Sequence, residues 1–404
     1  MTVLRLVAIA LIFVLAAGAW FVLAGTVDYR TNNSDEALGM QVEGLWGGPQ
    51  TQLAPTFVAE AGGKRGELDV LGSDIKGDFK LDQRRKGLLW YATYTVDFNG
   101  VYRVKNTAST PATATFALEF PSPDGQYDGF MVSVDGKQIP VSYGSGSASA
   151  TFRLPAGATA AIATGYHTQG LDTWSYVPVR DGVGVVKDFT LTMNTDFTKV
   201  DFPDSAVSPT NPIIEEAGHK SLTWHYENLV SGRPITLTMP KPMNPGPLAT
   251  RISMFAPVSL LFFFAGLVLL TATQGIRLHP INYAFLAAGF FAFHLLFAYL
   301  VDRVNINVSF LIASAASVAL CVGYLWMVPG TGKALLEIAL SQFVFLVLFS
   351  YSFFFEGLTG LAVTIGSVIT LGYFMAKTAR VDWETVFGKP KGVPIAGPFS
   401  SGPA

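Results

Sequence analysis

The side chains that could do chemistry in this chain are few and scattered. Five histidines occur among 404 residues, too dispersed for a local metal motif. His167, His219 and His225 lie in the most polar part of the sequence, where they are either ordinary imidazoles or parts of a zinc site assembled by the fold. No phosphate-binding, dinucleotide-binding, zinc-protease, serine-hydrolase or CxxC motif occurs. We therefore assign no catalytic, cofactor-binding or metal-ligating residue and expect a protein that is not an enzyme.

Paired acidic residues offer a second kind of chemistry. Asp201 with Asp204, and Glu215 with Glu216, could serve acid–base work or bind calcium. Both pairs occur in loop-like sequence, which favours solvated charge. Aromatic residues make up 13% of the chain, and three tryptophans could either line a glycan groove or fill a core: Trp90, Trp174 and Trp224.

Ionisable residues in apolar segments are more informative because burying charge in lipid is costly. His294 falls in the middle of one such segment, and we expect a neutral imidazole bonded to a neighbouring helix. Glu337 follows Lys333 by four residues, which predicts an ion pair near the end of a helix. An ion pathway would need several such groups, and these segments lack them.

The elements that position these residues follow from the hydropathy layout. A stretch of about 20 apolar residues can cross a bilayer as a helix. The chain has one such span at residues 4–24, then a long polar region, then five more spans, at 253–273, 282–301, 309–328, 334–354 and 358–376. Apolar residues make up 50% of the chain and charged residues 14%. The layout predicts six transmembrane helices, one before and five after a large domain.

The distribution of Lys and Arg predicts the orientation of these helices, since cytoplasmic loops carry the excess. With a cytoplasmic N-terminus, Arg303 is the one basic residue in the short outer loops. The basic residues that fall inside are Arg5, Arg277, Lys333, Lys377, Arg380, Lys389 and Lys391. Residues 25–252 then face the exterior, which in a bacterium with two membranes is the periplasm.

The first span is either an uncleaved anchor or a secretory signal. Its apolar run exceeds the roughly 7–15 residues of a signal-peptide core, and no small-x-small cleavage site follows it, which favours the anchor.

The polar region holds 19 basic and 24 acidic residues and no cysteine, so it must be stabilised by its hydrophobic core alone. Its net negative charge argues against nucleic acid as a partner.

The polar region alternates like β-structure. Apolar alternation on both sides of Asn99-Gly100 predicts a hairpin, since both residues tolerate positive φ. Further alternating runs occur at 114–120, 130–134, 150–154, 189–193, 222–226 and 235–239. Residues 203–218 read as a loop and 242–247 as a stiff connector. Short strands without helical periodicity predict an antiparallel β-sandwich. A weak internal sequence similarity within this region leaves open whether there are two tandem lobes or one large sandwich.

Small residues recur at every fourth position in two of the apolar spans. These positions are Ala284, Ala288 and Ala292 in one span and Ala315, Ala319 and Gly323 in the next. Such stripes let membrane helices approach closely. We interpret them as internal packing, with oligomerisation as the alternative.

Several segments are similar to motifs that occur together in one family of membrane proteins. The terminal part carries the signature most fully, in the runs Phe353-Phe-Phe-Glu356-Gly-Leu358, Ile365-Gly-Ser367 and Met375-Ala-Lys-Thr-Ala-Arg380-Val-Asp382-Trp383. Leu278-His279-Pro280-Ile-Asn-Tyr283 is similar to the family's opening of a membrane span, and Leu45-Trp46-Gly-Gly-Pro-Gln50-Thr51 to its motif outside the first helix. Arg84-Arg-Lys-Gly87, followed by Tyr94, is similar to a further motif of the same family. Together these segments resemble the CreD family of bacterial inner-membrane proteins, and the chain is identified as a divergent member of it.

The resemblance implies envelope-stress and β-lactam responses and colicin tolerance, without a defined biochemical activity. Its candidate motif residues are Trp46, Gln50, His279, Pro280, Tyr283, Glu356, Arg380, Asp382 and Trp383. In this reading Glu356 lies at the outer mouth of the bundle, and Asp382 and Trp383 anchor the last helix at the inner interface.

These observations together predict an α+β membrane protein of the inner membrane with cytoplasmic termini. Its parts are an anchor at 1–24, a periplasmic β-rich domain at 25–252, a five-helix bundle at 253–376 and a largely disordered tail at 377–404. We expect a non-enzymatic protein that presents the β-domain for envelope-stress sensing or protein contacts. The expected partners are the lipid bilayer and a membrane or periplasmic protein, with homo-oligomerisation open. The alternatives are an accessory subunit of a larger membrane complex and a transporter or ligand receptor.

Overall fold

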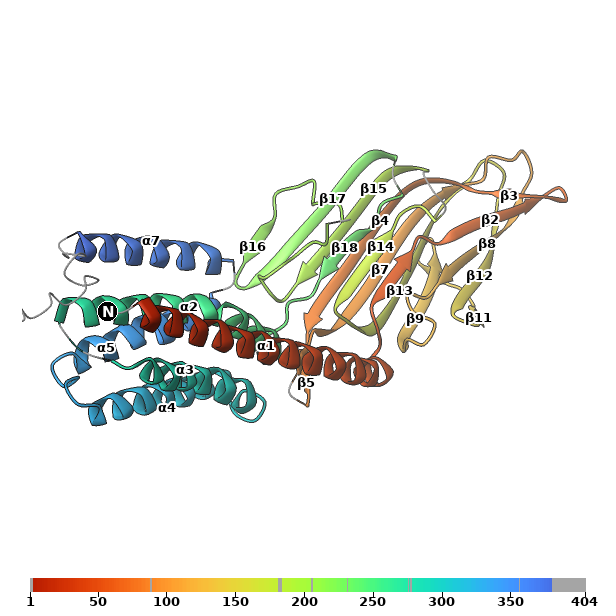
Figure 1. The fold of residues 1–404 in the computed structure, drawn as a ribbon. Coiled ribbons are helices and arrows are strands. Elements are labelled where there is room, and N and C mark those ends of the chain that lie inside the picture. The colour runs from red at the N-terminus through yellow and green to blue at the C-terminus, as the bar shows by residue number, and fades with distance from the viewer. Residues whose placement is uncertain are drawn as a thin grey trace, which may run out of the picture. The chain divides into compact units, whose positions relative to one another are not determined.

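A computed structural model describes residues 3–87, 89–180, 184–204, 206–230, 232–274, 276, 278–355 and 357–379. The chain forms two compact units: 33–243, and 1–32 together with 244–404. The helices are α1 (Val3–Trp46), α2 (Pro245–Gln274), α3 (Pro280–Leu300), α4 (Ile306–Met327), α5 (Leu335–Gln342), the π-helical segment η1 (Phe343–Leu348), α6 (Phe349–Tyr351), the 3-10 turn η2 (Ser352–Phe354) and α7 (Thr359–Thr378) (Figure 1).

The six predicted apolar spans correspond to six helices that are long and apolar enough to cross a membrane. The fifth, Leu335–Phe354, joins α5, η1, α6 and η2. Two helices are longer than predicted. α1 continues past residue 24 to Trp46, and α2 begins at Pro245, inside the predicted connector, because proline is tolerated in the first turn of a helix. The predicted tail lies almost entirely outside the described residues.

The sheet unit contains eighteen strands among the described residues. They are β1 (Gln50–Leu53), β2 (Thr56–Ala61), β3 (Lys64–Glu67), β4 (Asp69–Leu81), β5 (Arg84–Lys86), β6 (Leu89–Tyr91), β7 (Thr93–Lys105), β8 (Ala112–Glu119), β9 (Tyr127–Val134), β10 (Lys137–Gln138), β11 (Ser142–Gly144), β12 (Ser147–Leu154), β13 (Thr159–Leu171), β14 (Thr173–Val177), β15 (Val185–Thr195), β16 (Ile214–Glu216), β17 (His219–Val230) and β18 (Ile235–Thr238). Apart from the Asn99-Gly100 hairpin, every alternating run of the sequence analysis falls in one of these strands, except that Phe120 and Met239 lie just after the ends of β8 and β18.

The strands form sheets of eight, five, three and two strands. The largest has the order β10-β9-β13-β7-β4-β15-β17-β16, and the others are β11-β12-β8-β2-β3, β1-β14-β18 and β5-β6. Two pairs, β1 with β14 and β15 with β4, are parallel, so the expectation of a purely antiparallel fold was wrong. Parallel neighbours arise here because long crossovers separate these strands in sequence.

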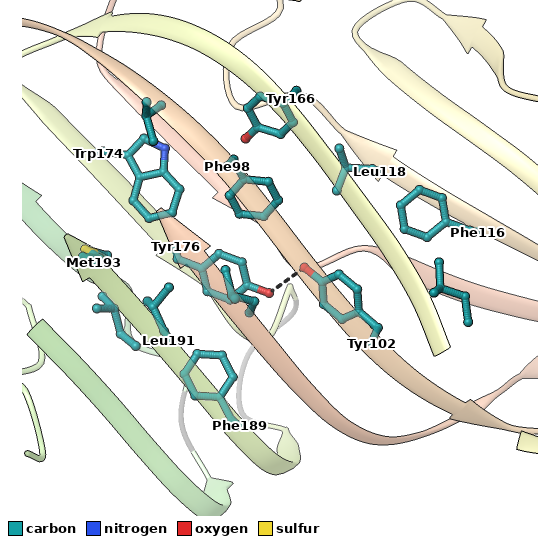
Figure 2. Close-up of a cluster of buried hydrophobic side chains, with 14 of the residues drawn as sticks. Phe98, Tyr102, Phe116, Leu118, Tyr166, Trp174, Tyr176, Phe189, Leu191 and Met193 are labelled. Carbon is teal, nitrogen blue, oxygen red and sulfur yellow. Dashed lines mark hydrogen bonds between the residues drawn. The ribbon is translucent and has the colours of Figure 1, made fainter. Parts of the chain in front are cut away.

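One hydrophobic cluster joins three of these sheets. Phe57 of β2 lies 5.6 Å from Tyr102 of β7, and Trp174 of β14 lies 5.3 Å from Phe79 of β4, measured between ring centroids. Figure 2 shows this cluster, in which the hydroxyls of Tyr102 and Tyr176 pair at 3.4 Å. The alternative of two tandem lobes is not supported, because the two internally similar parts of the region contribute residues to a single hydrophobic core.

The predicted hairpin at Asn99-Gly100 was wrong. Both residues continue β7 as a central strand, where Gly100 pairs with Thr164 on one side and Ile75 on the other. A Cβ on Gly100 would lie 2.9 Å from the Tyr102 ring. Glycine is therefore needed here for close approach of a large ring, which is its usual role inside a strand.

A hairpin forms instead within residues 203–218, which were expected to be loop. Ala217 and Gly218 have φ of 49° and 85°, the positive values that a two-residue hairpin turn requires. They join β16 to β17, and Glu215 forms an ion pair with Lys220 at 3.2 Å across the hairpin. This acidic residue therefore belongs to a surface ion pair.

Close packing of α3 on α4 does not use the predicted stripes. Ala288 and Ala319 are exposed, whereas a Cβ on Gly289 would lie 2.3 Å from the Cys321 sulfur. Ser317 donates to the Gly289 carbonyl at 2.7 Å, and Gln342 donates to the Ser317 carbonyl at 3.1 Å. The closest approach therefore occurs one residue away from the stripe, where polar groups can bond between helices.

Two further expectations for the helices were wrong. His294 is buried, but its Nδ1 bonds to the Phe290 carbonyl of its own helix at 2.9 Å, and its ring contacts Trp20 of α1 edge-on at 5.4 Å. Glu337 accepts a hydrogen bond from Gln274 at 2.7 Å. Lys333 precedes the first residue of α5, so the helical i to i+4 geometry for an ion pair with Glu337 is not formed.

We predict that Gly289→Ala lowers the apparent melting temperature of the full-length protein in detergent, because overpacking at a tight contact costs about 1–3 kcal/mol. Adding Cys321→Ala should restore much of the loss, since it removes the clashing sulfur. Gly323→Ala, which meets no heavy atom within 4 Å, is the matched control. Equal melting temperatures for Gly289→Ala and Gly323→Ala would contradict this packing.

Candidate functional site

The motif residues fall into three groups. Trp46 and Gln50 lie in the sheet unit, His279, Pro280 and Tyr283 lie at the start of α3 in the helical unit, and four others lie outside the described residues. Those four are Glu356, Arg380, Asp382 and Trp383, and their predicted roles stay predictions. The sheet unit brings together two motif segments that are separate in the sequence.

The contact between Trp46 and Arg84 forms the centre of this site. The Arg84 guanidinium carbon lies 3.5 Å from the centroid of the Trp46 ring. Asp82 holds the same guanidinium through Nε at 3.1 Å and Nη2 at 2.8 Å. A cation over a tryptophan face contributes about 0.5–1 kcal/mol at exposed sites. This stack, which we call the Trp46–Arg84 site, is therefore oriented by two independent contacts.

A small core beneath Trp46 fixes the end of α1. Trp46 Nε1 donates to the Tyr94 carbonyl at 3.4 Å, and Tyr94, itself fully buried, donates its hydroxyl to the Thr173 carbonyl at 2.8 Å. Burial raises the pKa of Tyr94 well above its usual value, so the phenol stays a donor. The apolar residues around Trp46 are Leu38, Val42, Leu89, Tyr91 and Leu171.

Gln50 connects the same segment to the eight-stranded sheet. Its side chain is 1% exposed and donates to the Gln169 carbonyl at 2.7 Å and to the Thr168 hydroxyl at 3.2 Å. Gly47 has φ of 112°, and a Cβ there would lie 2.8 Å from the Gln169 carbonyl oxygen. The glycine after Trp46 thus permits the close approach that brings Gln50 to its partners.

Gln52 belongs to this arrangement although the sequence analysis did not single it out. Its Nε2 donates to the carbonyls of Leu53 at 2.7 Å and Glu119 at 3.1 Å, and its Oε1 accepts from Tyr166 at 2.6 Å. The sequence could have identified Gln52, because it follows Gln50 by two residues and this spacing places both amides on one face of a strand. A fully bonded buried amide of this kind fixes the register of β1.

Asp172 lies beside this site at a strained position. Its φ is 60°, its backbone N–H donates to the Ala92 carbonyl, and its carbonyl accepts from Met239. Burial raises the pKa of Asp172 above its usual value; Lys241, at 3.9 Å, opposes the shift and Asp35 adds to it.

The other sequence candidates do not assemble into a reactive centre. His167 bonds to Asp97 at 2.7 Å and His225 to Thr190 at 3.0 Å, both at exposed positions. Trp174 and Trp224 are fully buried, so neither lines a glycan groove. Among the described residues, no three His, Cys, Asp or Glu side chains are grouped as a metal site would require.

The motif at the start of α3 is explained by helix capping. His279 accepts from the Ile281 N–H through Nδ1 at 3.3 Å, and Pro280 occupies the first turn, where its missing N–H costs nothing. Tyr283 is fully buried and meets Phe264 edge-on at 5.2 Å. Its neighbour Asn282, which the sequence analysis passed over, accepts from Tyr324 of α4 at 2.9 Å.

Among the described residues, six helices are long and apolar enough to cross a membrane, and the other unit of the chain is a large multi-strand domain. Residues 215–384 match the family model described as "Inner membrane protein CreD". The chain is thus similar to the CreD family of inner membrane proteins over this part of its length, and the resemblance predicted from the terminal motifs is confirmed there. The match begins inside β16 and covers β17, β18 and all helices from α2 to α7, whereas the motifs at 45–51 and 84–94 lie outside it.

Two solved structures are among those similar to the chain. A candidate nutrient binding protein from Legionella pneumophila is 12% identical, with a TM-score of 0.38, and the match covers 75% of this chain and 99% of that one. An M1 zinc metallopeptidase from Deinococcus radiodurans is 11% identical, with a TM-score of 0.24, and the match covers 81% and 97%. A search of curated proteins gives no significant match. Neither likeness is close enough to carry a functional argument.

We predict that Asp172→Asn raises the apparent melting temperature at pH 7. A raised pKa means that the folded state binds the proton more tightly, so the wild type loses stability as pH rises from 3.8 through the folded pKa. Asparagine avoids this loss and tolerates the left-handed backbone. Since the carboxylate is 40% exposed, we expect a gain of only about 1–2 °C.

The measurement is a series of melting curves of the wild type and of Asp172→Asn over a range of pH. The gain should vanish below pH 3.8, where both side chains are neutral. Asp135→Asn, which places the same side chain at another residue of positive φ, controls for backbone effects. A constant difference between wild type and Asp172→Asn at all pH values would contradict the assignment.

Proposed function

We propose that this inner membrane protein is not an enzyme and that it presents its sheet unit in the periplasm to bind another envelope protein. The sheets would pack as a sandwich, and the setting would be the envelope-stress response that the family resemblance implies. The excess of Lys and Arg in the short loops on one side of the helices supports the orientation.

The observation that carries this proposal is the Trp46–Arg84 site. Tryptophan and arginine are the side chains most enriched among residues that dominate binding energies. Arg84 is 51% exposed at its side chain, and Leu45, next to Trp46, is 71% exposed. The carboxylate of Asp82 and the small core beneath Trp46 hold these groups in place. Binding would therefore cost little side-chain entropy.

A second candidate is an accessory subunit of a larger membrane complex. The exposed residues Ala288 and Ala319 and the half-buried Gly323 line an open groove of about 520 Å³ between α3 and α4. Small residues let a further helix approach closely. A partner helix seated in this groove would favour this candidate.

The test is photo-crosslinking in intact cells, with a benzophenone amino acid at position 45. We expect one defined protein adduct, reduced about tenfold or more by Arg84→Gln, because a charged contact is worth about 1.5–3 kcal/mol. Arg85→Gln removes the neighbouring charge from the same strand, away from the Trp46 ring, and should leave the adduct unchanged. An adduct that survives both Arg84→Gln and Trp46→Ala would contradict the proposal.

A further inference from the structure

A groove in the helical unit runs along α7. It lies between α2, the α5–η1 segment and α7, and its volume is about 370 Å³. A second cavity of about 360 Å³ continues it, since both are lined by Val344, Phe345, Ile369 and Thr370. No residue of α7 is buried. The groove is thus an open, mostly apolar channel beside a loosely covered helix.

The wall opposite α7 is held in an unusual conformation. Residues Phe343–Leu348 form a π-helical segment, a feature that often occurs at functional sites. Ser259 of α2 donates a hydrogen bond to the Phe345 carbonyl. The Phe345 ring lies 6.0 Å from that of Phe262 and 6.3 Å from that of Phe374. This arrangement builds a continuous aromatic lining.

The charged side chains that line the groove lie at one end of it. Gln274 is the last residue of α2, Glu337 lies in the first turn of α5 and Lys377 in the last turn of α7. Glu337 accepts from Gln274 at 2.7 Å, and the Lys377 ammonium lies 5.7 Å from the Tyr373 ring centroid. Within the described residues, no acidic side chain lies within 4 Å of the Lys377 nitrogen. One cation and one anion thus line the same mouth.

We propose that this groove binds one phospholipid with an ethanolamine headgroup. Lys377 would contact the phosphate and Glu337 the ammonium, while an acyl chain follows Phe345 along α7. An ethanolamine headgroup carries both charges and so matches both Lys377 and Glu337. An anionic glycerol headgroup would leave Glu337 without a cationic partner and would place a phosphate near it. From Lys377 to Ala362 the helix rises roughly 22 Å, more than the roughly 15 Å of one hydrocarbon leaflet.

The test is native mass spectrometry of the full-length protein in detergent, with equal amounts of phosphatidylethanolamine and phosphatidylglycerol of identical chains. We expect one retained ethanolamine lipid, about tenfold over the glycerol lipid, as one charge-assisted contact would give. Glu337→Gln should abolish this preference. Lys333→Gln, which removes a nearby charge that does not line the groove, should keep it.

A second pair of variants tests the groove itself. Thr370→Trp places a large ring where the two cavities meet, so it should lower ethanolamine-lipid retention about tenfold. Thr364→Trp adds the same ring on the same helix at a position that lines neither cavity and should bind as wild type. Equal retention of both lipids by the wild type, or undiminished retention by Thr370→Trp, would overturn the proposal.

Discussion

The structure depends on one constraint: α1 is a single helix with two different environments along its length. Its first part, up to residue 32, belongs to the helical unit, where Trp20 is fully buried against Phe291 and His294. Its last part belongs to the sheet unit and ends at Trp46. Arg30 marks the change, since it pairs with Asp302 at 2.7 Å and bonds to the Ala298 carbonyl at 3.1 Å.

The end of α1 is fixed by a series of contacts in which each residue positions the next. The small core around Tyr91 and Leu171 positions Trp46, and Trp46 positions Arg84. The glycine at 47 then turns the chain so that Gln50 and Gln52 reach buried carbonyls. Because an unpaired buried amide costs about 1–3 kcal/mol, these glutamines leave β1 one favourable register. The Trp46–Arg84 site is therefore a consequence of how the chain enters its first strand.

Much of the fold could be predicted because its determinants are local. The length of an apolar run sets a spanning helix, and alternation sets strands such as β8, β12 and β17. What could not be predicted depends on partners far away in sequence. Asn99-Gly100 has the composition of a turn, yet the two flanking strands and the Tyr102 ring keep it extended. Likewise, the small-residue stripes gave no indication that Gly289 would meet Cys321. For the site, the motif segments at 45–51 and 84–94 were visible, but the contact between Trp46 and Arg84 was not.

The central claim is that the helices hold this protein in the inner membrane with the sheet unit on the periplasmic side. Single cysteines at Ser145, exposed in the turn between β11 and β12, and at Ser400 test it in a Cys321→Ala background, since Cys321 is the one native cysteine. The account predicts that an impermeant thiol reagent labels position 145 in intact cells and position 400 only after lysis. Labelling of position 400 but not 145 in intact cells, or equal labelling of both, would contradict it.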